Sequence, residues 1–175
     1  MIKITLPDGS IKEFTVNSTP FDVAKSISEG LARNIISASF NGTTVETTTP
    51  LTTDGSLVLF TFSEDAGKKA FWHSSAHVLA EAILSFHPNA KLTIGPAIDN
   101  GFYYDLDLGE DVISEKDFKE IEDKFLEIAR GKHEFSMRSV SKADALSLYK
   151  KENNQYKVEL IENLTDGDIT FCDHS

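Results

Sequence analysis

Two histidines that can stand one helical turn apart are the residues whose type and spacing first suggest chemistry. His73 and His77 lie in the stretch FWHSSAHVLAEAIL, residues 71–84. Positions i and i+4 of a helix share one face. A neutral imidazole offers one hydrogen-bond donor and one acceptor, and its unperturbed pKa of about 6.5 lets it exchange protons near neutrality. The pair can therefore hold a water or hydroxyl, share a metal ion, or simply border a buried stripe.

A metal site at this pair needs at least a third protein ligand. Cys172 and His174 are two residues apart on an expected strand, so they share a face and complete a conceivable set. Their spacing is not a familiar zinc pattern, and HSSAH lacks the glutamate of an H-E-x-x-H protease. We therefore expect no metal in this chain. A metal-dependent hydrolase that uses these four side chains remains the alternative.

Three further residues are candidates for a binding site. Gly95 lies in the stretch KLTIGPAIDNGFYYD, residues 91–105, where a backbone without a side chain lets a ligand approach closely. Tyr103 and Tyr104 alternate faces, so only one of them can face the histidines; both can also be ordinary sheet aromatics. Lys157 follows Tyr156 at an expected helix start, where the helix dipole does not favour a cation. It can equally be a solvated surface lysine.

The elements that must position these residues are readable from periodicity and turn signals. The Asn100-Gly101 pair predicts a hairpin, Ser114 with Asp117 predicts a helix start, and Gly131 ends that helix. Ser141 predicts another helix start. The expected helices begin at 69, 114, 142 and 156, the first ending at 86 before Pro88 and the last at 164, and the expected strands are 92–98, 102–108, 133–140 and 169–173.

The first 62 residues predict a separate small sheet over one helix. Strands Ile2–Leu6 and Ile11–Val16 flank the turn Pro7-Asp8-Gly9, and Thr19 can cap a helix. Further strands are expected at 35–40 and 57–62, which gives the order β-β-α-β-β. This part has no histidine, cysteine or phosphate-binding glycine loop, so it is interpreted as a binding or spacer module. The predicted organisation is a first domain at 1–62, a linker at 63–67 and a second domain at 68–175.

Composition limits the class of protein. The 175 residues are 40% hydrophobic and 10% aromatic, which is typical of a globular chain. The net charge is −11, and no basic face is visible in the sequence. A nucleic-acid partner must therefore be held mainly by residues outside this chain. There is no membrane-spanning run and no signal peptide, and the single Cys172 suits a reducing compartment. We expect a cytoplasmic location and no membrane partner. Because the chain stops within an expected strand, we also expect it to be part of a longer protein.

Three stretches in order carry a resemblance to a known family. HSSAHVLAEAI, then TIGPAIDNGFYYDLDL, then YKVELIENL are similar to the N-terminal region of bacterial threonyl-tRNA synthetase. The first 62 residues resemble its TGS domain, a ubiquitin-like β-grasp module. Residues from about 63 resemble its editing domain, whose relatives occur in alanyl-tRNA synthetase. The expected fold class is therefore α+β, a β-grasp domain followed by a larger α/β editing domain.

The resemblance implies a function for each part. The editing domain would hydrolyse serine wrongly attached to the threonine tRNA, and the tRNA 3′ aminoacyl end would be its partner. The family's histidines, lysine and tyrosine map to His73, His77, Lys157 and Tyr104, with Tyr104 as a substrate contact. Gly95 is expected to contact the substrate because its backbone has no side chain. The family also has a C-x-x-x-H pair that this chain lacks, so Cys172 is not the family cysteine and we expect that motif beyond Ser175.

Cofactors and assembly follow from the same resemblance. No cofactor is expected in these residues, whereas zinc and ATP with magnesium are expected in a downstream aminoacylation domain. A homodimer is expected through downstream domains. Besides the metal-dependent hydrolase, a non-catalytic interaction region remains the rival interpretation.

Overall fold

The computed structural model describes residues 1–131, 135–167 and 169–174, with the side chains of all of these except 173 and 174. Two compact units share the chain. The first comprises residues 1–74 and 98–101, and the second comprises residues 75–97 and 102–175. None of the helices in the described part is long and apolar enough to cross a membrane.

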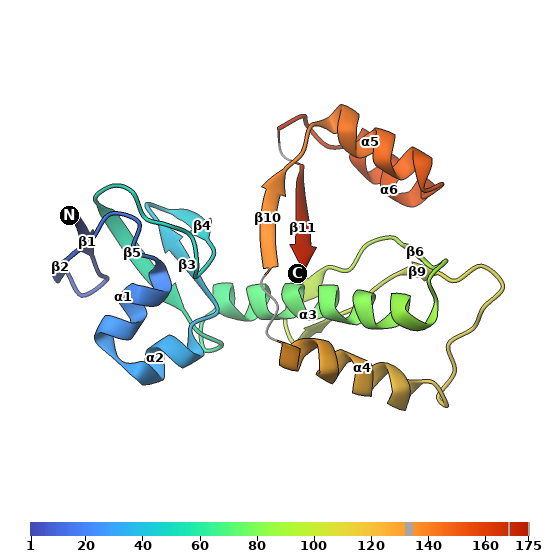
Figure 1. Cartoon of the computed structure of the whole chain (residues 1–175), viewed down its shortest axis with the longest axis horizontal. Helices are drawn as coiled ribbons and strands as arrows, with labels where there is room; N and C mark the ends of the chain where they lie inside the picture. Colours follow the sequence, from blue (N-terminus) through green and yellow to red (C-terminus); the bar gives the residue numbers. More distant parts are fainter. Residues whose placement is uncertain (132–134, 168, 175) are drawn as a thin grey trace. The chain divides into compact units, whose positions relative to one another are not determined.

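The first unit is a mixed sheet with two short helices (Figure 1). Its strands occur in the order β2-β1-β5-β3-β4, and β1 is parallel to β5 while the other pairs are antiparallel. The elements are β1 (Ile2–Thr5), β2 (Ile11–Phe14), α1 (Pro20–Ile27), α2 (Glu29–Asn34), β3 (Ser37–Phe40), β4 (Thr43–Val45) and β5 (Gly55–Phe60). The predicted sheet with helical cover is confirmed, with β4 as an additional strand in the Thr-rich segment.

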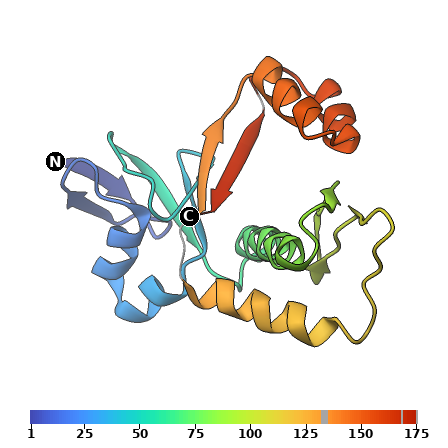
Figure 2. The same cartoon turned by 45° about the vertical axis from the view of Figure 1, so that its right-hand side comes forward.

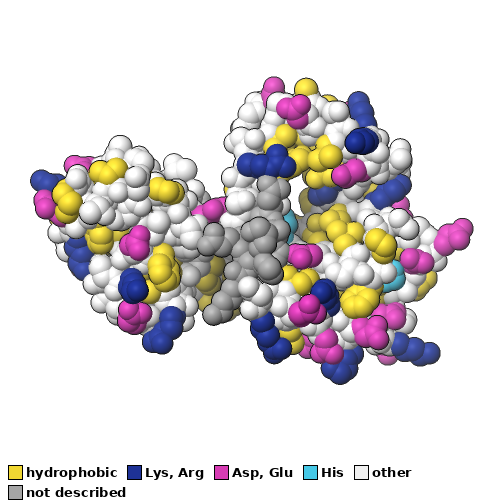
Figure 3. All heavy atoms as spheres, viewed as in Figure 1, with side chains coloured by type: hydrophobic (Ala, Val, Ile, Leu, Met, Phe, Trp, Pro, Cys, Tyr) yellow, Lys and Arg dark blue, Asp and Glu magenta, His cyan; other side chains and the backbone are white. Residues whose placement is uncertain are grey.

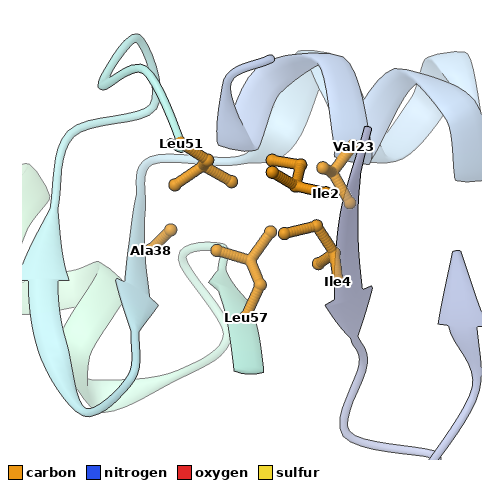
Figure 4. Packing of buried hydrophobic residues seen from close by; sticks show 6 residues of the cluster. All are labelled: Ile2, Ile4, Val23, Ala38, Leu51 and Leu57. Atoms are coloured by element: carbon orange, nitrogen blue, oxygen red, sulfur yellow. The ribbon is translucent and has the colours of Figure 1, made fainter. Parts of the chain in front are cut away.

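Strand alternation creates the core of this unit. Ile2 and Ile4 are buried on one face of β1, and Lys3 between them is exposed. Burial of such side chains stabilises the fold by about 25 cal/mol per Å² of apolar surface removed from water. Figure 4 shows these two side chains meeting residues from α1, β3, β5 and the segment before β5. The cluster consists of Ile2, Ile4, Val23, Ala38, Leu51 and Leu57.

The helical part of the first unit begins as predicted and continues differently. Thr19 and Asp22 form a reciprocal capping box, and Pro20 occupies the first helical position. The prediction of one helix in this unit is wrong, because there are two. Ser28 adopts an extended backbone, and its hydroxyl accepts the Leu31 N–H at 3.0 Å, so it ends α1 and caps a second helix.

The long helix α3 (Asp65–Phe86) begins inside the predicted linker, and its later part, residues 75–86, belongs to the second unit. A second helix, α4 (Phe118–Gly131), packs against α3 through Ile121 and Ile128. The buried face of α3 includes small side chains as well as Val78 and Ile83. The buried residues of α3 within the second unit are Ser75, Ala76, Val78, Ala80, Ala82 and Ile83.

The predicted hairpin of residues 92–108 forms only short ladders. Its strands are β6 (Lys91–Leu92), β7 (Ala97–Ile98), β8 (Gly101–Phe102) and β9 (Leu106–Asp107), with β6 paired to β9 and β7 paired to β8. The two continuous strands predicted here are therefore interrupted. Pro96 supplies no N–H to a ladder, and residues 103–105 lie between β8 and β9 outside any strand.

The C-terminal part of the second unit is an antiparallel strand pair with a helical hairpin at one end (Figure 2). Its elements are β10 (Phe135–Ser139), α5 (Lys142–Lys151), α6 (Gln155–Glu162) and β11 (Thr170–His174). Ala145, Ile161 and Ile169 form its core. The predicted helices and the final strand are confirmed, and residues 133 and 134 of the predicted strand lie outside the described residues. The overall α+β class is confirmed as well.

Candidate functional site

The predicted histidine pair lies on one continuous helix. His73 and His77 are both residues of α3, so the expected one-turn spacing is confirmed. His73 is exposed and His77 is half-buried. The His77 ring centroid lies 6.2 Å from that of Phe135, with the two rings tilted by 47°. His77 therefore borders the core beside the start of β10, and its imidazole retains access to solvent.

The metal alternative finds no support among the described side chains. No three His, Cys, Asp or Glu side chains gather into a group that could hold a metal ion in the part of the chain that the structure describes. The side chain of His174 lies outside the described residues, and Cys172 is a half-buried residue of β11 that is not part of a disulfide. The expectation that this chain holds no metal stays a prediction.

Gly95 and Tyr104 are in direct contact. A Cβ atom placed on Gly95 would lie 2.5 Å from Cε2 and 3.1 Å from Cγ of the Tyr104 ring. The space beside the glycine backbone, predicted to admit a ligand, is therefore taken by a side chain of this protein. The two residues predicted to contact the substrate form one local feature. Their contact with a substrate stays a prediction.

Of the two neighbouring tyrosines, Tyr104 is the one held inside the second unit. Tyr103 is 51% exposed, whereas Tyr104 is half-buried. Burial raises the pKa of the Tyr104 hydroxyl, and the nearby Tyr149 adds to that shift. The Tyr104 hydroxyl is therefore protonated at neutral pH and can donate a hydrogen bond to a bound molecule.

Lys157 has an environment unlike that of a solvated surface lysine. It lies in the first turn of α6 and is half-buried. Burial alone lowers the pKa of its ammonium group, because desolvation disfavours the charged form. No acidic side chain hydrogen-bonds to or pairs with this ammonium among the described side chains, which are those of residues 1–131, 135–167 and 169–172. Perturbed pKa values of this kind cluster at functional sites, and structural positions also show them.

Asn154 and Tyr156, which are not among the predicted site residues, hold the first turn of α6 in place. Asn154 is 8% exposed and is the N-cap of α6, and its side chain also donates to the Leu92 carbonyl at 3.2 Å. The Tyr156 hydroxyl donates to the Asp107 carboxylate at 2.8 Å. The position of an asparagine before an apolar helical pattern could have indicated the cap. Nothing in the sequence indicates that Asn154 contacts Leu92 or that Tyr156 contacts Asp107.

The surface around these elements is apolar in places and has scattered charges. Figure 3 shows hydrophobic side chains on both sides of a hollow between the α5–α6 hairpin and the α3 part of the second unit. Lys and Arg side chains on this face are interspersed with Asp and Glu side chains. A shallow pocket nearby is lined by Leu106, Asp107, Leu108, Gly109, Asp111, Val112, Ile113 and Tyr156.

The arrangement of the first unit defines the class of domain. Its mixed five-stranded sheet, with the first and last strands parallel and adjacent, is that of a β-grasp module. Residues 2–61 match the family model of the TGS domain. The chain therefore carries a TGS domain, as the sequence resemblance implied.

The relatives extend the match beyond this domain. The chain is 66% identical over 175 residues to threonine–tRNA ligases of Flavobacterium johnsoniae and Flavobacterium psychrophilum, and 47% identical over 171 residues to that of Cytophaga hutchinsonii. These alignments cover 98–100% of this chain, but only 26–27% of each ligase. The chain thus spans about a quarter of the length of these relatives. Its sequence matches the N-terminal region of threonine–tRNA ligases.

Proposed function

We propose that this chain belongs to a threonine–tRNA ligase, and that its second unit removes serine wrongly attached to the threonine tRNA. The proposal is supported by the 66% identity to ligases over all 175 residues. The single structural observation that carries the hydrolytic part is Lys157. Its half-buried ammonium has a pKa lowered by burial and has no acid partner in the described part of the chain.

The need for such a reaction follows from the amino acids themselves. Serine lacks only the methyl group of threonine, and one such group gives about 10- to 200-fold discrimination in a binding pocket. Translation requires more than that. A second site that accepts the smaller serine and excludes threonine can supply the difference by hydrolysing the wrong ester.

The proposed reaction is attack of water on the ester carbonyl carbon of Ser-tRNA. The water oxygen bonds to that carbon, the bond from carbon to the ribose oxygen breaks, and one water proton passes to the ribose oxygen. The products are serine and a tRNA with a free 3′ hydroxyl. Such a reaction needs a positioned water, a proton carrier and a positive charge beside the developing oxyanion.

The candidate residues have the chemistry for these roles. His73 and His77 would orient the water and carry its proton, since imidazole exchanges protons near neutrality. The Lys157 ammonium would stabilise the oxyanion, and low hydration would strengthen that interaction. The Tyr104 hydroxyl, kept protonated by its raised pKa, would donate to the substrate beside Gly95.

Other parts of the proposal concern regions outside these 175 residues. Zinc and ATP with magnesium would be bound by a downstream aminoacylation domain, which would also mediate a homodimer and hold most of the tRNA. This chain would receive the aminoacyl-bearing 3′ end. A limited role of this kind is compatible with its net charge of −11. We also propose a cytoplasmic location, where tRNA is charged.

The test is the double variant His73→Ala/His77→Ala in the full-length protein. Hydrolysis of Ser-tRNA is expected to fall by about 10²–10⁴-fold, because a positioned acid–base group is lost. The rate of threonine attachment is expected to stay nearly unchanged. Thermal unfolding is the control, because His77 borders the core. A folded double variant that hydrolyses Ser-tRNA at the normal rate would refute the proposal.

A further inference from the structure

The first turn of α6 is fixed to the β6–β9 strand pair at two points. At one point, the buried Asn154 side chain caps the helix by accepting the Lys157 N–H at 3.2 Å, and it donates to the Leu92 carbonyl of β6 at 3.2 Å. At the other point, the Tyr156 hydroxyl donates to the Asp107 carboxylate of β9 at 2.8 Å.

Both fixed points are themselves restrained. Leu92 and Leu106 are paired residues of the β6–β9 ladder, and Asp107 pairs with Lys91. The Asp107 carboxylate also accepts the Gly109 N–H at 2.9 Å. The Gly109 N–H and the Tyr156 hydroxyl lower the pKa of Asp107, in that order of effect, so this acceptor is ionised at neutral pH. A charged acceptor makes the stronger kind of hydrogen bond.

The hydrogen bond between Tyr156 and Asp107 restrains the residue next to Lys157. Tyr156 immediately precedes Lys157 in the turn, so its side-chain bond fixes the backbone from which the lysine side chain extends. The Lys157 ammonium itself has no acid partner among the described residues to hold it. Its position therefore depends on the backbone of this turn and on the packing of its methylene groups.

We propose that Tyr156 and Asp107 are positioning residues, which hold the Lys157 ammonium in a half-buried place where it acts on the substrate ester. The inference rests on the proposed function for its reaction, but the device itself can be tested without substrate. Loss of the bond would let the turn move away from β9 and let water reach the ammonium. A displacement of about 1 Å at a reacting group is enough to cost roughly 100-fold in rate.

The test compares Tyr156→Phe with the wild-type chain. The variant removes a single oxygen and keeps the ring, and Tyr103→Phe is the matched control at an exposed tyrosine. The first measurement is an NMR titration of the Lys157 side chain in the 175-residue protein. In Tyr156→Phe we expect the Lys157 pKa to move up toward the ordinary value of 10.5. In Tyr103→Phe we expect the wild-type titration.

The second measurement is Ser-tRNA hydrolysis by the full-length protein. Tyr156→Phe is expected to slow it by roughly 10- to 100-fold, with Tyr103→Phe near the wild-type rate. Asp107→Ala removes the acceptor from the opposite side and is expected to reproduce both effects. The double variant Tyr156→Phe/Asp107→Ala is expected to be no slower than the slower single variant, because both changes remove one interaction.

The outcomes distinguish the positioning role of Tyr156 and Asp107 from the proposed hydrolysis of Ser-tRNA. If Tyr156→Phe leaves both the Lys157 titration and the hydrolysis rate unchanged, the positioning role is wrong and the proposed function stands. A double variant whose losses simply multiply would also overturn the positioning role. If Lys157→Ala does not slow hydrolysis, the proposed function of Lys157 fails. The titration of Tyr156→Phe still decides whether Tyr156 positions this ammonium.

Discussion

The ring of Tyr104 lies against the backbone of Gly95, in the place that a Cβ atom on residue 95 would occupy. The contact includes Cγ at the base of the ring as well as its edge, so a small rotation of the side chain cannot make room. Residue 95 must therefore be a glycine, because Tyr104, in the returning half of the hairpin, occupies the space of a larger side chain.

The first prediction follows from this contact. Gly95→Ala should lower the free energy of unfolding by about 1–3 kcal/mol, because the added methyl overpacks the site. It should also displace Tyr104 and slow Ser-tRNA hydrolysis. Chemical denaturation and the hydrolysis rate are the measurements. Gly30→Ala is the matched control, since a Cβ there meets only the Ser28 hydroxyl at 3.9 Å. Unchanged stability in Gly95→Ala would show that the ring is free to move.

The second prediction concerns the free energy of unfolding, which the buried charge of Lys157 lowers. Lys157→Met should raise the free energy of unfolding near pH 7 and abolish most Ser-tRNA hydrolysis. The physical reason is that methionine keeps an apolar stem and removes a charge whose burial is unfavourable. Thermal unfolding is the measurement, with Lys69→Met at an exposed position of α3 as the control.

The difference in the free energy of unfolding between Lys157→Met and the wild-type chain should depend on pH in a definite direction. The pKa of Lys157 is lower in the folded chain than its ordinary value of 10.5, so the unfolded chain binds more protons between the two values. The wild-type free energy of unfolding therefore rises with pH in that window. The advantage of Lys157→Met should shrink as the pH passes upward through it. A constant advantage at all pH values would contradict this origin.

The third prediction concerns the capping box of α1. The Asp22 carboxylate accepts the Thr19 N–H at 2.9 Å and the Thr19 hydroxyl at 2.8 Å, and these bonds lower its pKa below 3.8. Asp22→Ala should destabilise the first unit at neutral pH. Because the folded pKa is depressed, the wild-type advantage is complete above about pH 4 to 5 and is lost as the pH falls through the folded pKa.

Denaturation of the chain at several pH values measures this effect. Glu29→Ala in α2 is the comparison, since this exposed acidic residue lies in the first turn of its helix without a capping box. A loss in Asp22→Ala that persists unchanged at the lowest pH would show that the carboxylate charge is irrelevant.

The fourth prediction concerns the domain boundary. Residues 1–62 should fold alone and give a dispersed amide spectrum, as the capped helices and complete sheet imply. Residues 1–74 should be the more stable fragment. The reason is that Phe62 packs edge-on against Phe71 at 5.2 Å and Trp72 at 5.9 Å between ring centroids. A disordered spectrum from residues 1–62 would refute the predicted boundary.

Local signals made much of this structure predictable. Thr19 and Ser141 were identifiable as caps because the partner of each lies three residues away, and both caps occur as expected. The break at Ser28 was missed because the helical pattern continues across it. Phe21 and Ile27 recur at helical spacing in the sequence, but they are 42% and 44% exposed, and the buried residues of α1 are Pro20, Val23 and Ala24.

The candidate site was only partly predictable for the same reason. Lys157 could be selected through the family resemblance, but its burial depends on α6 packing against a hairpin far away in the sequence. The bond between Tyr156 and Asp107 joins residues 49 positions apart, and no spacing rule connects them. Gly95 was selected as a place where a ligand could approach the backbone, and the group that lies there is the Tyr104 ring.

The parallel pairing of β1 with β5 has a consequence for synthesis of the chain. Ile4 pairs with Gly55, and the Lys3 N–H donates to the Asp54 carboxylate at 2.8 Å, so the first strand is completed by residues about fifty positions later. Contacts of such long sequence separation slow folding, because the intervening chain must be ordered first. On the ribosome, the β1–β2 hairpin would emerge early with one edge of β1 unsatisfied. It would wait for β5, and only then could the sheet close around its core.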